Sequence, residues 1–226
     1  MENLKNIYLI IPAGGSGKRM NSPIPKQFIE IDNVPIIIHT LRKFDKIKEI
    51  NKIIISIAPE ITEELKSYIH NFNIITPTYY VANGEFRHIS VYNALVSEHC
   101  NNADYVLIHD AVRPNISSNL IHNIINSLSQ YDSVIPVVPA KDTIKEVDKD
   151  NFIIRTLNRE ILRQVQTPQA FKYDIILKAY NQAITQNAIF TDDSAIAELA
   201  GEKVKAILGE ESNIKITTTE DLKSIK

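Results

Sequence analysis

Short apolar runs rich in β-branched residues alternate along this chain with segments of helical period, and this alternation constrains the fold most strongly. The runs "IYLII", "KIIISIA", "TYYVA", "DYVLIH" and "SVIPVVP" are typical of buried strands. The segments "PIIIHTLRKF", which opens with Pro35, "PEITEELKSYI", "RHISVYNALVSE" and the serine-capped "SSNLIHNIINSLSQ" favour helices. The pattern predicts an α/β fold in which helices cover both faces of a mostly parallel sheet.

The alternation is interrupted after the strand "SVIPVVP". The segment "KDTIKEVDKDNFIIRTLNREIL" has strand-like pieces around a turn and no crossover helix, so we expect an arm or a hairpin that leaves the sheet. After it, we expect "YDIILKAYNQAI" and "DDSAIAELAG" as helices, "KVKAIL" and "NIKITT" as strands, and "TEDLKSI" as a short helix. The 226 residues, 44% of them hydrophobic, predict one domain over residues 1–226.

Charge and cysteine content exclude several classes of protein. The 25 basic and 27 acidic residues give a net charge of -2, so nothing indicates a nucleic-acid or anionic-membrane partner. The single cysteine, Cys100, excludes an internal disulfide framework and suits a reducing compartment. No apolar run reaches the roughly 18 residues that a membrane span requires, and the start "MENLKN" lacks the features of a signal peptide. We therefore expect a cytoplasmic protein.

A glycine-rich loop with three cations follows the first expected strand. Its glycines and cations are Gly14, Gly15, Gly17, Lys18, Arg19 and Lys26. In open α/β sheets, ligands bind beyond the carboxyl ends of the strands. Glycines let backbone N–H groups approach an anion, and the cations add positive charge, so the loop predicts a polyphosphate site. The alternative is a tight turn with solvated basic residues, but a turn alone does not require three glycines and three cations.

Two common phosphate motifs do not fit this loop. The Walker pattern fails because Arg19 follows Gly17-Lys18 and Pro12 stands where the first glycine belongs. The dinucleotide fingerprint fails because Met20 stands where glycine or alanine is required. A P-loop kinase and a nicotinamide-dependent dehydrogenase are therefore both disfavoured.

Further candidate ligand-binding residues follow the other expected strands. They are Gly84, Glu85 and Arg87, then Asp110 and Arg113, then Lys141, Asp142 and Thr143. Some of these candidates also have a structural interpretation, Asp110 as a turn residue and Arg113 as a surface arginine. Lys215 alternates with isoleucines in "NIKITT" and by itself indicates the solvent face of a strand.

Eight short motifs together resemble one enzyme family. The loop, with its G-x-R-M and downstream P-K, resembles the signature of nucleoside-diphosphate sugar and alcohol pyrophosphorylases. Eight motifs of this chain resemble, in order and spacing, those of the 2-C-methyl-D-erythritol 4-phosphate cytidylyltransferase family, and together they span nearly the whole chain. They are "PAGGSGKRM", "PKQF", "GEFRHISV", "HDAVRP", "KDTIKEV", "QTPQAF", "TDDSA" and "NIKITTTEDL". Two small departures are Ala13-Gly14, where the family often has two alanines, and the residue before Arg19, whose charge varies.

The resemblance implies a single-domain, Rossmann-like nucleotidyltransferase fold and a homodimer joined through a protruding β-arm, residues 141–159. It also implies Mg²⁺-dependent transfer of CMP from CTP to a phosphorylated polyol, with release of pyrophosphate. An anionic phosphate must attack an anionic triphosphate, so charge neutralisation and alignment matter more than a proton-transferring base.

The resemblance also implies roles for individual residues. Arg19 and Lys26 would stabilise charge on the α-phosphate and the leaving pyrophosphate, while Arg159 and Lys215 would position the incoming phosphate. The nucleotide would be bound by Ala13, Gly14, Gly15, Gly17, Gly84, Glu85, Arg87, Ser90, Asp110 and Ala111. The polyol end would be lined by Asp110, Arg113, Thr143, Thr167, Thr191 and Asp192. Asp110 is the candidate ligand of Mg²⁺, which prefers carboxylate and phosphate oxygens, and Thr143 and Arg159 would reach the other subunit's site.

Three functions remain open at this point. They are the methylerythritol phosphate cytidylyltransferase of isoprenoid precursor synthesis, a ribitol 5-phosphate cytidylyltransferase, and a non-catalytic nucleotide-binding regulator. Arg19, Lys26 and Arg159 argue against the regulator, because a binding module does not need cations for a transition state. The segments "TDDSA" and "PAKDTIKEV" favour the first enzyme over the second.

Overall fold

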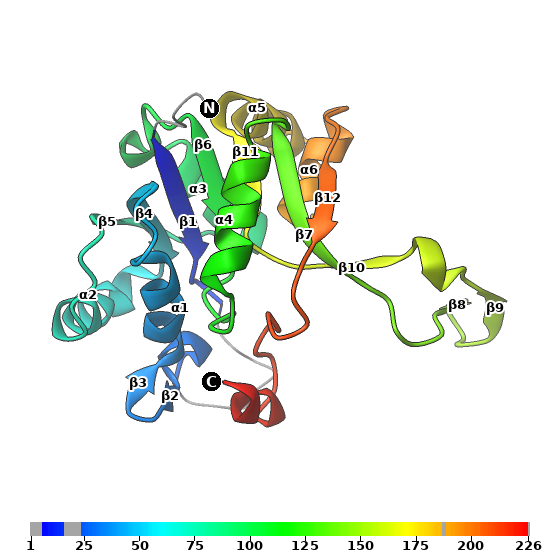
Figure 1. Cartoon of the computed structure of the whole chain (residues 1–226), viewed down its shortest axis with the longest axis horizontal. Coiled ribbons are helices and arrows are strands. Elements are labelled where there is room, and N and C mark those ends of the chain that lie inside the picture. The colour runs from blue at the N-terminus through cyan, green and yellow to red at the C-terminus, as the bar shows by residue number, and fades with distance from the viewer. Residues whose placement is uncertain (1–5, 16–23, 187–188, 226) are drawn as a thin grey trace.

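An eight-stranded sheet lies between two layers of helices in the part of the chain that the computed structural model describes, residues 6–15, 24–186 and 189–225 (Figure 1). The strands of this sheet are β1 (Ile7–Pro12), β4 (Ile50–Ile57), β5 (Thr78–Ala82), β6 (Tyr105–Ile108), β7 (Ser133–Pro139), β10 (Arg163–Val165), β11 (Gln169–Lys172) and β12 (Lys205–Leu208). Their order is β10-β7-β11-β6-β1-β4-β5, and β12 pairs with β7.

Most strand pairs in the sheet are parallel. Strand β1 pairs in parallel with β4 and β6, β4 with β5, and β7 with β12. Strand β11 lies antiparallel between β6 and β7, and β10 runs antiparallel along β7. The expected α/β fold with a mostly parallel sheet is therefore confirmed.

Alternate side chains of each central strand enter different cores. Ile7, Leu9 and Ile11 of β1 pack with the layer formed by α1 (Ile36–Phe44), α2 (Thr62–Asn71) and α4 (Ser118–Ser127). Tyr8 and Ile10 pack on the other face with α3 (Arg87–Leu95), α5 (Tyr173–Ile184) and α6 (Asp193–Leu199). Because successive strand residues point to opposite faces, a strand covered on both sides reads as a continuous apolar run.

Local signals set where several helices begin. Pro35 precedes α1, where its fixed φ suits a helix entry. Ser117 caps α4, since its hydroxyl oxygen accepts a hydrogen bond of 3.0 Å from the Leu120 N–H. In the described ranges, none of the helices is both long and apolar enough to cross a membrane.

The expected hairpin is present as an arm that stands away from the sheet (Figure 1). Its strands β8 (Lys145–Val147) and β9 (Ile153–Thr156) pair antiparallel. Phe152, Ile153 and Ile154 are more than half exposed there. The arm therefore presents apolar side chains that its own chain does not cover.

The expected strand "NIKITT" is wrong. Residues 213–217 have irregular backbone, tied to the rest of the fold by a hydrogen bond of 2.9 Å from the Ile216 N–H to the Val112 carbonyl. Ile216 is buried against Ile36 and Val112, so burial on one side produces the alternation without a ladder.

Several short elements differ from the expected pattern or lie outside it. The segment "TEDLKSI" forms the expected short helix, as a 3₁₀ helix, η6 (Glu220–Ser224). The pattern did not reveal the small hairpin of β2 (Glu30–Ile31) and β3 (Val34–Pro35), nor β10 and β11. Each of these strands has only two to four residues, and none contains an apolar run like those of the central strands.

Candidate active site

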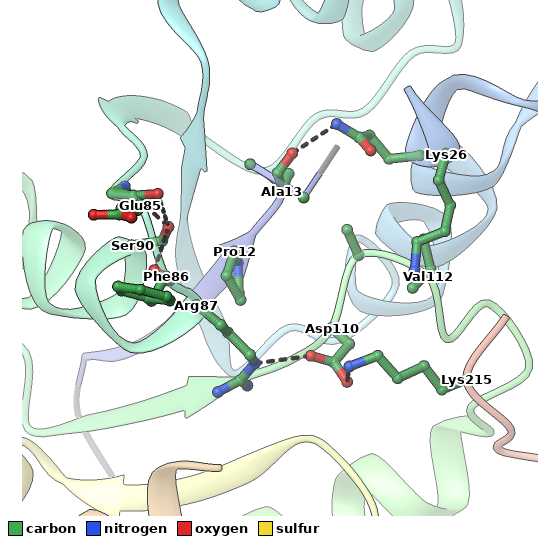
Figure 2. Close-up of a pocket in the computed structure, with 15 residues that line it drawn as sticks. Pro12, Ala13, Lys26, Glu85, Phe86, Arg87, Ser90, Asp110, Val112 and Lys215 are labelled. Atoms are coloured by element: carbon green, nitrogen blue, oxygen red, sulfur yellow. Dashed lines mark hydrogen bonds and ion pairs between the residues drawn. The ribbon is translucent and has the colours of Figure 1, made fainter. Parts of the chain in front are cut away.

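A cavity of about 190 Å³ lies where β1 and β6 end and α3 begins (Figure 2). The residues that line it include every described candidate for nucleotide binding: Ala13, Gly14, Gly15, Gly84, Glu85, Arg87, Ser90, Asp110 and Ala111. Lys26 and Lys215 line it as well. Gly17 and Arg19 lie outside the described residues. The carboxyl edge of the sheet thus brings together segments that are far apart in the sequence.

Buried hydrogen bonds fix the first part of the glycine-rich loop. The Ala13 N–H donates to the Ser56 carbonyl at 2.7 Å, and the buried Gln27 amide donates to the Ala13 carbonyl at 2.7 Å. A Cβ atom at Gly14 would overlap the side chain of Asn83, whereas a Cβ at Gly15 would lie within 4 Å of no atom of the described residues. Close packing against Asn83 therefore explains why this chain has glycine at position 14.

A second set of short contacts shapes the turn that precedes α3. The Gly84 N–H donates to the Ser90 hydroxyl at 3.0 Å, and that hydroxyl lies 3.2 Å from the Phe86 carbonyl. The Ser56 hydroxyl donates to the Ser90 carbonyl at 2.5 Å. A Cβ atom at Gly84 would overlap Ile89. These contacts hold the Gly84–Phe86 turn beside the loop after β1.

Three cations surround the carboxylate of Asp110, which is only 6% exposed. Its Oδ1 accepts a hydrogen bond of 3.0 Å from Arg87 Nε, while its Oδ2 lies 2.9 Å from Lys215 Nζ and 3.3 Å from Arg113 Nε. Burial opposes ionisation, but Arg87, Lys215 and Arg113 together hold the pKa of Asp110 well below its ordinary value. The site therefore contains an ionised carboxylate at its centre.

The side chain of His109 ties the end of β6 to its neighbours. Its Nε2–H donates to the Arg113 carbonyl at 3.2 Å, and its Nδ1 accepts from the Thr167 hydroxyl at 3.0 Å. The Thr167 oxygen also accepts from the Asp110 N–H at 3.1 Å. Burial lowers the pKa of His109 to about 3, so the ring is neutral and holds the backbone around Asp110 in place.

A second cavity, of about 440 Å³, shares Lys215 with the first. Its lining includes Arg113, Lys141 and Asn213. The Asn213 side chain is fully buried, and its amide donates to the Thr167 carbonyl at 2.8 Å. Arg113, a candidate for the polyol end, therefore lines the second cavity, and Lys215, the candidate for positioning the incoming phosphate, lines both.

Other candidates for the polyol end lie elsewhere. Thr167 is buried behind Asp110, and Thr191 is exposed outside the residues that line either cavity. Thr143 and Arg159 are exposed on the arm, where Arg159 donates to the Lys141 carbonyl at 2.7 Å. The described chain does not bring these two arm residues to the cavities.

The two adjacent aspartates of "TDDSA" have different surroundings. Asp192 caps α6, accepting from the Ala195 N–H at 3.3 Å and from the Gln169 amide at 2.9 Å. Asp193 is fully buried and contacts Arg87. Sequence reasoning selected Asp192 for the polyol and missed Asp193, because adjacency alone does not tell which of the two carboxylates is buried against Arg87.

Comparisons with known proteins agree with one another. The family model described as "IspD: 2-C-methyl-D-erythritol 4-phosphate cytidylyltransferase" matches residues 7–226. A curated protein of that name from Clostridium botulinum (strain 657 / Type Ba4) is 44% identical over 216 residues, which cover 95% of this chain and 93% of the relative. Another, from Bacillus cereus (strain ATCC 10987 / NRS 248), is 38% identical over 214 residues, with the same coverage of 95% and 93%.

A solved structure gives the same result at the level of the fold. The crystal structure of 4-diphosphocytidyl-2C-methyl-D-erythritol synthase from Anaerococcus prevotii DSM 20548 superposes with a TM-score of 0.84 at 33% identity. The match covers 98% of this chain and 96% of that one. The chain therefore belongs to the 2-C-methyl-D-erythritol 4-phosphate cytidylyltransferase family, whose members are nucleotidyltransferases.

Proposed function

We propose that the cavity at the ends of β1 and β6 is where this chain carries out the reaction of its family. That reaction uses CTP and forms 4-diphosphocytidyl-2C-methyl-D-erythritol in non-mevalonate isoprenoid precursor synthesis. The observation that carries the assignment is the carboxylate of Asp110, surrounded by Arg87, Lys215 and Arg113 beside the glycine-rich loop.

The reaction is a displacement at phosphorus. An oxygen of the polyol phosphate attacks the α-phosphorus of CTP, the bond from that phosphorus to the bridging oxygen breaks, and pyrophosphate leaves with the electron pair. Both reactants are anions, so preorganised cations lower the barrier by neutralising charge and aligning the groups.

The described cations suit the two ends of this reaction. Lys26 lines the nucleotide cavity, where its Nζ donates to the Ile216 carbonyl at 3.3 Å, and we assign it to the triphosphate. Lys215 lines both cavities, so it is placed to contact the incoming phosphate and the nucleotide. Arg19 is assigned to the α-phosphate by its place in the glycine-rich loop.

The donor set suits a Mg²⁺ ion that arrives with CTP. Within the described residues, no group of three or more histidine, cysteine, aspartate or glutamate side chains forms a ready-made metal site. Mg²⁺ in nucleotide enzymes is commonly held by one or two carboxylates together with substrate phosphates, and Asp110 supplies one such carboxylate. The ion would offset negative charge on the phosphate oxygens of CTP.

We further propose that the arm, residues 141–159, joins two copies of the chain. Its uncovered side chains, Phe152, Ile153 and Ile154, provide an apolar surface for a self-complementary contact. A second copy would also bring Thr143 and Arg159 to the cavity bordered by Arg113 and Lys215. The compartment that we propose is the cytoplasm, because a chain with one cysteine needs no oxidising environment.

Phosphorus NMR tests the proposed activity directly. The purified protein is mixed with CTP, Mg²⁺ and 2-C-methyl-D-erythritol 4-phosphate, and the spectrum is followed with time. We expect one equivalent of pyrophosphate for each new diphosphate diester. Pyrophosphate formed without the diester would indicate hydrolysis, and an unchanged spectrum would indicate no transfer; either result would contradict the proposal.

A further inference from the structure

The guanidinium group of Arg87 bridges two buried carboxylates. Its Nε donates to Asp110 at 3.0 Å, while Nη1 and Nη2 donate to the two oxygens of Asp193, each at 2.9 Å. Figure 2 shows Arg87 reaching from the start of α3 to Asp110 across the base of the cavity. Parallel contacts to both oxygens of Asp193 fix the plane of the guanidinium as well as its distance.

A buried tyrosine, Tyr180, donates a hydrogen bond to Asp193. Asp193 is fully buried in the first turn of α6, and the hydroxyl of the equally buried Tyr180, on α5, donates to its Oδ1 at 2.6 Å. Asp193 and Tyr180 are not among the residues that line the described nucleotide cavity, whereas Arg87 and Asp110 are. The chain of contacts therefore runs from α5 through α6 and α3 to the central carboxylate.

The pairing with Asp193 distinguishes Arg87 from the other two cations at Asp110. Arg87 contacts two carboxylates, and three of its N–H groups are engaged by them. Lys215 lines both cavities and Arg113 lines the second, whereas Arg87 lines the first alone of these two. Arg87 is therefore suited to orient Asp110, while Lys215 and Arg113 are placed to meet the substrates.

We propose that Asp193 and Tyr180 are positioning residues, which lock Arg87 so that it holds the Asp110 carboxylate in the orientation the reaction requires. This inference rests on the proposed function of the cavity. Buried groups that orient a contact residue commonly change activity by about 10- to 100-fold when they are altered. A purely structural ion pair would instead affect only the stability of the fold.

Two variants and two matched controls separate these roles. Asp193→Asn keeps the shape of the side chain but removes its charge, and Tyr180→Phe removes only the hydroxyl. Glu198→Gln removes an exposed charge from the same helix as Asp193. Tyr92→Phe removes a hydroxyl that bonds Asn181, from a ring that stacks against Tyr180.

Steady-state kinetics of pyrophosphate release, with thermal melts of each protein, provide the readout. We expect Asp193→Asn to lower kcat by about 10- to 100-fold and also to raise the KM for CTP, because Arg87 and Asp110 line the nucleotide cavity. Tyr180→Phe should lower kcat several-fold, and both controls should match the wild type. If Asp193→Asn does not fold, Tyr180→Phe decides alone. A normal kcat in a folded variant of this pair, whatever its melting temperature, would overturn the proposal.

A double-mutant cycle tests whether Asp193 acts through Arg87. Arg87→Lys keeps the charge but cannot make the same parallel contacts, so in that background Asp193→Asn should lower kcat much less than it does alone. Equal losses in both backgrounds would show that Asp193 acts independently of Arg87, which contradicts the proposal.

Different results would contradict this inference and the proposed function. If the wild-type protein releases no pyrophosphate, the proposed function is wrong. Calorimetric titration with Mg²⁺ and CTP then tests whether Asp193 and Tyr180 position Arg87 in the cavity. In that experiment, weaker CTP binding by Asp193→Asn and Tyr180→Phe, with normal binding by the controls, would support the role of positioning. Unchanged binding in the two variants would overturn it.

Discussion

The carboxylate of Asp110 lies at the centre of the charged groups in the site. Because Arg87, Lys215 and Arg113 outweigh its burial, the pKa of Asp110 in the folded chain lies well below the value of an unfolded chain. A depressed pKa contributes its full stabilisation of the folded state above the unfolded value of about 3.9, and that contribution is lost progressively as the pH falls from there through the folded value. Asp110 is therefore ionised at neutral pH.

Replacement of Lys26 tests the role of the cations. Lys26 lies in a short 3₁₀ helix, η2 (Lys26–Phe28), at the edge of the cavity, so Lys26→Ala should leave the melting temperature nearly unchanged. Turnover should fall by about two to three orders of magnitude, as expected for the loss of one preorganised donor at developing charge. Steady-state kinetics measure the turnover and a thermal melt measures the melting temperature. The control is Lys48→Ala, which replaces an exposed lysine. Turnover of Lys26→Ala near that of the control would contradict the role.

The buried ring of His109 predicts how stability depends on pH. Burial lowers the pKa of His109 to about 3, whereas an unfolded histidine titrates near 6.5, so the unfolded state takes up a proton first as the pH falls. The stability from this group is complete above about pH 6.5 and declines by up to about 1.4 kcal/mol per pH unit below it. Urea unfolding between about pH 5.5 and 4 should show a shallower decline for His109→Gln than for the wild type. Parallel declines would show that His109 is not the group responsible.

Residue chemistry next to strand ends was the most reliable guide to the site. Asp110 and Glu85 follow strands directly, and the parallel sheet brings both to one cavity. Asp193 and Tyr180 could not be selected from the sequence, because their role depends on how α5 and α6 are rotated against the sheet. Gln27 was also missed, since only the folded loop shows its bond to the Ala13 carbonyl.

At the scale of elements, the long strands and helices follow from periodicity, while the short elements do not. Strand β4 and helix α4 each bury a continuous or periodic apolar face, so local pattern and tertiary packing agree. The segment around Lys215 has a strand-like pattern but pairs with no strand among the described residues. The Nζ atom of Lys215 still lies 2.9 Å from Asp110 Oδ2, because the hydrogen bond of the Ile216 N–H to the Val112 carbonyl anchors the irregular backbone.

Complementation tests whether the arm carries Arg159 into a second copy. Arg159→Ala and Lys26→Ala, each inactive, are mixed and allowed to exchange subunits. A mixed dimer would contain one site with both native residues, so an equal mixture should recover about a quarter of wild-type activity. Pyrophosphate release measures the recovery.

A second pair of variants serves as the control for this mixture. Lys26 and Lys215 line the same cavity of one chain, so Lys26→Ala mixed with Lys215→Ala should recover nothing. If exchange is demonstrated by mass and the Arg159→Ala mixture remains inactive, then Arg159 does not act on the site of the other subunit.

At the scale of the whole molecule, one edge of a parallel sheet explains why distant segments form a single site. The loops after β1 and β6 and the turn before α3 all lie at the carboxyl edge, as is general for open α/β sheets. The chain carries a net charge of only -2, so binding of anionic substrates depends on this local cluster of cations and not on an overall basic surface.

Substrate choice is the most direct test of the central claim that this chain transfers CMP to 2-C-methyl-D-erythritol 4-phosphate. A site that hydrogen-bonds the hydroxyls of its substrate rejects analogues that leave its polar groups unpaired, by up to about 10⁴-fold. The measurement compares pyrophosphate release with this substrate and with ribitol 5-phosphate, at equal sub-saturating concentrations with CTP and Mg²⁺. We predict that kcat/KM is larger for 2-C-methyl-D-erythritol 4-phosphate by orders of magnitude, and faster release with ribitol 5-phosphate would contradict the claim.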